Sequence, residues 1–213
     1  MHRSIYSLGL AFLLLSLAAN ATTFTFDSDP FAGTPVLTTP GRQIVGGEEF
    51  ISFSPGTDLF QLSSSAFGVS GPVHFINGTA SAVPSGGVNV VVLETFDDDN
   101  NTLTPFGAGQ AANLIADRIT APGAGFFIYF NQSLDLPRLV YSTDLSSNTS
   151  DLKILARMLN LNGAQGKNEL PDFSAANFEI TTATNAVPEP ASLLMMSTGL
   201  LGIGRALRRK IRG

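Results

Sequence analysis

An apolar run bordered by basic residues stands at each end of the 213-residue chain, so only the segment between the two runs is free to form a globular domain. At the amino end, a basic start is followed by an apolar run over 5–18 and then by the small residues Ala19 and Ala21. This is the layout of a secretory signal peptide. We therefore predict a signal peptide over 1–21, cleaved by signal peptidase between Ala21 and Thr22. The alternative, an uncleaved membrane anchor, needs a longer apolar run than this one.

The carboxyl end carries an extended motif, then an apolar segment, then a basic cluster. Proline fixes its own φ angle and disfavours helix at the residue before it, so we expect extended chain at the motif, which consists of Val187, Pro188, Glu189 and Pro190. As a helix, the segment 191–207 would rise about 25 Å, just short of a typical hydrocarbon core. We predict a marginal transmembrane helix there. A basic tail over 205–213 should stay cytoplasmic; its bases are Arg205, Arg208, Arg209, Lys210 and Arg212.

The motif, the apolar segment and the basic cluster together resemble the PEP-CTERM sorting signal of Gram-negative bacteria, over residues 185–213. The resemblance implies recognition by an exosortase, a membrane-embedded cysteine protease or transpeptidase, and cleavage at or near Pro188–Pro190. Those residues would then be substrate residues rather than catalytic ones. The resemblance also implies a bacterium with exopolysaccharide or biofilm loci, and release to the cell surface or retention there. An ordinary tail anchor with a proline-rich linker is the alternative.

Composition excludes several classes of partner and site for the segment between the signals. The chain has 17 acidic residues, all between Asp27 and Glu189, and six bases share that region, which gives it a formal charge of −11. Nucleic acids and anionic lipids require a basic surface, so neither is expected as a partner. The chain has no cysteine, which excludes disulfides, thiolate metal sites and a cysteine nucleophile.

The body over 22–184 is long enough for one compact domain, and its pattern predicts an all-β fold, a single β-sandwich of the jelly-roll kind. Short β-branched and aromatic runs alternate there with turn residues. We expect strands over 22–26, 43–45, 49–54, 59–62, 73–76, 88–96, 125–131, 138–143 and 178–182. Residues 151–161 fit a helix or a strand, and we favour a strand because a polar hairpin loop precedes them. Residues 111–119 fit either a short helix or a further strand.

One metal site is suggested by the acidic run Asp97, Asp98 and Asp99, which follows the apolar strand predicted over 88–96. Calcium prefers hard oxygen ligands of this kind, and an ion would relieve the repulsion between adjacent carboxylates. A solvated turn at the end of a buried strand is the simpler interpretation. Apart from this possible calcium, we expect no cofactor.

We predict no catalytic residues. A serine hydrolase would have to use His74, the only histidine of the predicted mature region, but the sequence has no Gly-x-Ser-x-Gly motif to supply the nucleophile. A pair of carboxylates drawn from Glu48, Glu49, Glu94 and the aspartates could form a glycosidase site only if two of them faced each other across a cleft. We therefore expect a membrane-anchored precursor that becomes a surface or extracellular-matrix protein, with a structural or adhesive role in exopolysaccharide or biofilm. The alternatives are a secreted carbohydrate-active enzyme or sugar-binding module, and a calcium-stabilised adhesin.

Overall fold

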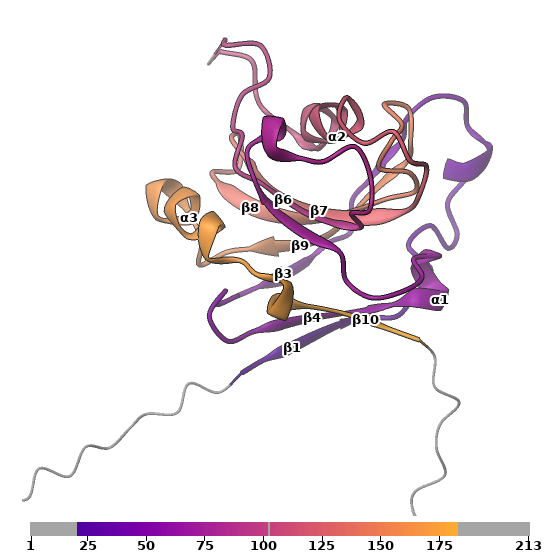
Figure 1. The fold of residues 1–213 in the computed structure, drawn as a ribbon, viewed down its shortest axis with the longest axis horizontal. Coiled ribbons are helices and arrows are strands. Elements are labelled where there is room, and N and C mark those ends of the chain that lie inside the picture. The colour runs from indigo at the N-terminus through magenta and orange to yellow at the C-terminus, as the bar shows by residue number, and fades with distance from the viewer. Residues whose placement is uncertain (1–20, 102, 183–213) are drawn as a thin grey trace, which may run out of the picture.

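The computed structural model describes residues 21–101 and 103–182, which form a layered β-rich body (Figure 1). The predicted sorting segment and nearly all of the predicted signal peptide lie outside these residues, as does the predicted transmembrane helix over 191–207. Within the described ranges, no helix combines the length and the apolarity that crossing a membrane requires.

The larger sheet of the described body has seven strands. Its order is β2-β9-β8-β7-β6-β5, and β3 also pairs with β9. The strands are β2 (Ile44–Val45), β3 (Glu49–Ile51), β5 (Phe75–Gly78), β6 (Val90–Leu93), β7 (Gly125–Asn131), β8 (Leu136–Ser142) and β9 (Leu152–Met158). All residues of β7 are buried, as expected for a continuous apolar run in the middle of a sheet.

Helix α2 (Ala108–Ala116) covers one face of this sheet. It connects β6 to β7, which are parallel neighbours, and a parallel pair requires a crossover of this kind. Its buried residues recur at helical spacing and pack against inward-facing residues of the central strands. The helical residues are Ala108, Ala111, Ala112 and Ile115, and their strand partners include Val91, Phe127, Val140 and Ile154.

A three-stranded sheet packs on the opposite face. It consists of β1 (Thr23–Phe26), β4 (Leu59–Ser63) and β10 (Phe178–Thr181), with β4 in the centre and both neighbours parallel to it. The core between the sheets is rich in phenylalanine. The rings of Phe53 and Phe60 stack with centroids 4.1 Å apart, and Phe173 also stacks with Phe53, at 5.4 Å. The body therefore has two cores, one on each face of the larger sheet.

The short helical elements lie between the strands. They are α1 (Ser64–Phe67), α3 (Gly163–Glu169) and 3-10 turns at Val36–Thr38, Ala80–Ala82, Leu170–Asp172 and Ala175–Asn177. Figure 1 shows α3 at the side of the larger sheet, away from α2.

The prediction of a mostly β body is confirmed, and two sheets do face each other, but the jelly-roll prediction is wrong. A jelly roll is built from antiparallel strands. Here only the β7–β8 and β8–β9 pairs are antiparallel, and the six other pairs among the described residues are parallel. A helix also covers the outer face of the larger sheet. The physical reason is that periodicity identifies a strand without identifying its neighbour or its direction.

Candidate functional site

The predicted sorting motif and membrane-stop bases lie outside the described residues, and so does Ala19. Of the predicted cleavage site, Ala21 and Thr22 are described, and both are exposed directly before β1. Among the described residues, Thr22 is the first to take part in the pairing with β4, through its backbone carbonyl.

The three predicted metal ligands lie close together in the loop after β6. One carboxylate oxygen from each of Asp97, Asp98 and Asp99 lies within 4.8 Å of the others. Hydrogen bonds within the loop also stabilise it. The Asp99 carboxylate accepts one from the Asn101 N–H at 2.9 Å and one from the Thr104 hydroxyl at 2.8 Å. The Thr104 hydroxyl, followed by the Asn101 N–H, lowers the pKa of Asp99. The carboxylates are thus near enough to share one cation, and calcium binding stays a prediction.

Thermal unfolding with and without calcium tests that prediction. A site with a Kd of about 1 mM should stabilise the fold by about 1.4 kcal/mol at 10 mM calcium, which corresponds to an increase of roughly 4 °C in the midpoint. The Asp98→Asn variant should lose this response, whereas Asp117→Asn, an exposed acid at the end of α2, should keep it. If calcium does not change the thermal midpoint of the unaltered chain, the prediction of a calcium site is wrong.

A pocket of about 310 Å³ opens between the two sheets, and sequence reasoning did not foresee it. It is lined by the end of β1 and the loop that follows, by the start of β3, by β9 and by α1. The buried rings of Phe26 and Phe67 contribute apolar surface, as does Leu155. The polar lining carries three carboxylates and one ammonium group, from Asp27, Asp29, Glu49 and Lys153.

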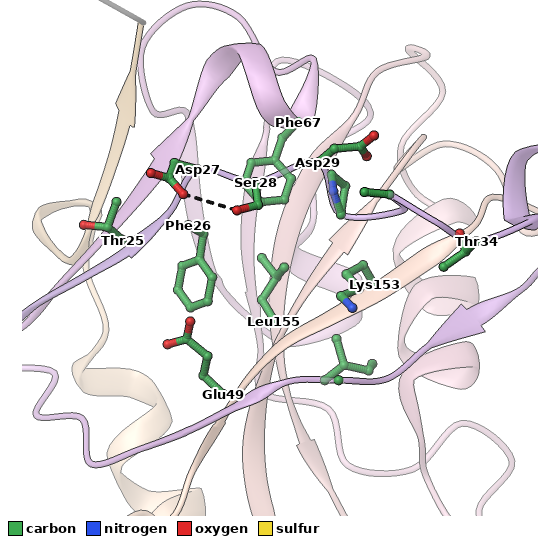
Figure 2. Close-up of a pocket in the computed structure, with 14 residues that line it drawn as sticks. Thr25, Phe26, Asp27, Ser28, Asp29, Thr34, Glu49, Phe67, Lys153 and Leu155 are labelled. Carbon is green, nitrogen blue, oxygen red and sulfur yellow. Dashed lines mark hydrogen bonds between the residues drawn. The ribbon is translucent and has the colours of Figure 1, made fainter.

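Acidic residues from two elements line this pocket (Figure 2). Glu49 extends from β3 toward the Phe26 ring, while Asp27 and Asp29 belong to the loop after β1. The Ser28 hydroxyl donates to Asp27 at 3.4 Å. Lys153 of β9 is fixed by donating to the Gly46 carbonyl at 2.6 Å. The pocket thus gathers Glu49 and two aspartates in one lining.

The exposure of these carboxylates bears on what the pocket can do. Glu49, Asp27 and Asp29 are all exposed side chains. Carboxyl pairs that catalyse glycoside hydrolysis depend on the burial of one member, which keeps it protonated as the acid. The arrangement therefore supports binding of a polar ligand better than it supports catalysis.

Glu48 has a different role from its neighbour Glu49. Its side chain is 6% exposed and forms ion pairs with Arg138 of β8 and with Arg157 of β9, the latter at 2.6 Å. Burial alone would raise the pKa of Glu48, but hydrogen bonds from its own backbone N–H and from the two guanidinium groups outweigh burial and lower it to about 2. Glu48 thus anchors the start of β3, and with it the pocket wall formed by Gly47 and Glu49.

The other residues considered for chemistry lie apart from this pocket. His74 is exposed just before β5, and its backbone N–H donates to the Asn89 side chain at 2.8 Å. Glu94 follows β6, where its N–H donates to the Gly78 carbonyl at 2.8 Å. Neither residue lines the pocket.

Residues 186–210 match the PEP-CTERM protein-sorting motif. None of the curated proteins and none of the solved structures that were compared with the chain matches it. The match confirms the resemblance at the carboxyl end, and at this coarse level it indicates an exported, membrane-anchored precursor that exosortase sorts.

Proposed function

We propose that this chain is an exosortase substrate that becomes a structural or adhesive component of the cell surface or extracellular matrix, with no chemistry of its own. The observation that carries the proposal is the sorting-motif match over 186–210. The predicted signal peptide over 1–21 supports it, because the motif has a use only on a chain that is exported. The acidic composition of the body is consistent with it, because a negatively charged body disfavours nucleic acid as the partner.

Mass spectrometry of both termini of the protein, recovered from cells with an active exosortase, tests the sorting step. We expect the mature chain to begin at Thr22 and to end near Pro188–Pro190. A triple alanine variant of Pro188, Glu189 and Pro190 should keep the terminus at Gly213, because the extended segment that the protease reads is lost. The same variant should still begin at Thr22.

Two controls separate sorting from other causes. Cells that lack the exosortase should yield the unaltered chain with Gly213 intact. Alanine at Asp172, an exposed acid that also follows a proline, should leave both termini as in the unaltered chain. Loss of the tail without an exosortase would contradict the sorting role.

The pocket favours a more specific form of this function, in which the body binds matrix polysaccharide. Three carboxylates and one ammonium group give the polar lining a formal charge of −2, and the buried Phe26 and Phe67 add apolar lining. Carboxylates accept hydrogen bonds from sugar hydroxyls, and they accept stronger ones from protonated amines. We therefore assign to the pocket a sugar that carries an amino group, in preference to a neutral or acidic one.

Titration with short oligosaccharides tests this assignment. Glucosamine oligomers should bind more tightly than glucose oligomers of the same length. In a double variant, Asp27→Asn with Glu49→Gln, Kd for the glucosamine oligomer should rise about tenfold or more, since charge-assisted hydrogen bonds are lost. The matched control is Asp117→Asn with Glu169→Gln, which removes the same charge far from the pocket. Equal affinities in the two double variants would exclude the pocket as the binding site.

A further inference from the structure

The first residue of the predicted mature chain contacts a buried carboxylate. The backbone nitrogen of Thr22 lies 2.9 Å from Oδ1 of Asp58, and the Thr22 carbonyl accepts a hydrogen bond from the Leu59 N–H, also at 2.9 Å. These bonds begin the parallel pairing of β1 with β4. Thr22 itself is exposed, while Asp58 is only 5% exposed.

Among the described residues, the hydrogen bonds that Asp58 accepts come from neutral donors alone. Besides Thr22, these donors are the Thr57 hydroxyl at 3.2 Å and the Ser54 N–H at 2.9 Å. Both ion pairs found among residues 21–101 and 103–182 belong to Glu48, so neither involves Asp58. A buried carboxylate is costly unless a cation compensates it.

The segments packed around this contact contribute no second charge. Residues 54–57 and the described segment 174–178 contain no titratable side chain, nor do residues 22–26. The Asn177 amide donates to the backbone carbonyl of Asp58 at 2.8 Å, and the nearby Glu179 accepts from Gln61 instead. Asp58 is therefore the titratable group that faces the nitrogen of Thr22.

We infer that Asp58 is a binding site for the amino terminus that signal-peptide removal creates, an inference that rests on the export proposed above. Hydrolysis of the Ala21–Thr22 peptide bond leaves a carboxylate on Ala21 and an amine on Thr22, which takes up a proton near neutral pH. The nitrogen that donated as an amide then donates as an ammonium group. Its position at 2.9 Å from Oδ1 makes the new contact an ion pair.

This ion pair makes the fold sensitive to where the chain is cut. A cut one residue earlier moves the ammonium group by about 3.8 Å, and the amide that remains at Thr22 is neutral. Within the described residues of the precursor Asp58 has no cationic partner, and cleavage at the predicted site supplies one. Processing and the final stabilisation of the three-stranded sheet are coupled through a single side chain.

The effect of pH has a definite sign. An α-amino group has an ordinary pKa of about 7.7–8.0, and a carboxylate in contact raises it. A group whose pKa is raised on folding stabilises the fold fully below its unfolded pKa and loses that contribution as pH rises through the folded pKa. The stabilisation should therefore be complete at pH 6 and absent at pH 10.5.

The test compares the chain from Thr22 to Gly213 with the same chain extended by Ala21, both in mild detergent. At pH 6 the chain that begins at Thr22 should unfold about 4 °C higher, and the two midpoints should converge at pH 10.5. In Asp58→Asn the two lengths should unfold together at both pH values. Equal midpoints for the two lengths at pH 6, or the same difference in Asp58→Asn, would overturn the inference.

A second measurement needs no substitution, so it stands even if Asp58→Asn fails to fold. Acetylation consumes only the unprotonated form of an amine. The acetylation rate of the terminal amine is measured at pH 7.5 relative to that of the lysine side chains, in the folded chain and in the chain unfolded by urea. An ion-paired terminus should have a relative rate several-fold lower in the folded chain. An unchanged relative rate would also overturn the inference. Neither experiment involves export. An amino terminus other than Thr22 in cells would therefore contradict the proposed processing, while the outcomes in vitro judge the ion pair alone.

Discussion

Replacing Gly166 with alanine should destabilise the fold by about 3 kcal/mol or more, although alanine is normally the better helix former. Gly166 is buried in α3, and an added Cβ would lie 2.2 Å from the Leu161 carbonyl oxygen and 3.2 Å from the Phe130 ring. The carbonyl belongs to the backbone and cannot rotate away. Helix α3 would have to move off β7, and the thermal midpoint should fall by roughly 10 °C.

Gly109 in α2 provides the matched control. A Cβ there would meet its nearest atom, Cδ1 of Ile44, at an ordinary 3.7 Å. Gly109→Ala should therefore be neutral or stabilising by up to about 1 kcal/mol, because only the helix propensity changes. Similar midpoints for Gly166→Ala and Gly109→Ala would show that α3 does not pack as described.

Replacing Glu48 with glutamine should cost about 3 kcal/mol near neutral pH, because it leaves Arg138 and Arg157 without their shared partner. Chemical unfolding with urea measures this difference. The pKa of Glu48 is lowered to about 2 in the folded chain. Its contribution is therefore present above its unfolded pKa of about 4.3 and is lost as pH falls toward 2, so the two chains should converge in acid.

The adjacent glutamate is the control for this change. Glu49 is exposed and forms no ion pair within the described body, so Glu49→Gln should alter the free energy of unfolding by less than about 0.5 kcal/mol. The two variants therefore test different properties. Glu48→Gln tests the stability of the fold, whereas Glu49→Gln changes a residue that lines the pocket. A large loss of stability in Glu49→Gln, or none in Glu48→Gln, would reverse these roles.

Strands with strong patterns were predictable from the sequence. The expected strand over 125–131 coincides with β7, because a continuous apolar run is fully buried there. The preference for a strand within 151–161 is confirmed by β9, in which Lys153 and Arg157 are half-buried and their neighbours are buried. The strand expected over 73–76 is observed at Phe75–Gly78, since an edge strand has a weaker pattern.

The arrangement of the strands was not predictable in the same way. Strand β4 pairs with two strands that come from the two ends of the body, and the register places Phe60 beside both Phe24 and Phe178. No local pattern marks such distant partners. From the sequence, residues 111–119 fit either a helix or a strand, and most of them belong to α2. Its buried residues are spaced i, i+3, i+4 and i+7 from Ala108, which is the spacing of a helix.

The candidate sites divide in the same way. Asp97, Asp98 and Asp99 are neighbours in sequence, so their proximity follows from the chain itself. The pocket draws Asp27, Glu49 and Lys153 from three separate segments, and only the tertiary structure brings them together. Sequence reasoning considered Glu49 as one acid of a pair, but it had no means of identifying the other side of the pocket.

The parallel course of β10 along β4 would have a mechanical consequence if the body were held at a surface by its carboxyl end. Strand β10 is the last strand described, and its register with β4 runs from Phe178 to Thr181. Tension applied beyond Thr181 would act along the strand axis, so the ladder bonds would be loaded in shear, all together, rather than peeled apart in turn. A body built this way should hold its shape under drag from flow or from an attached matrix.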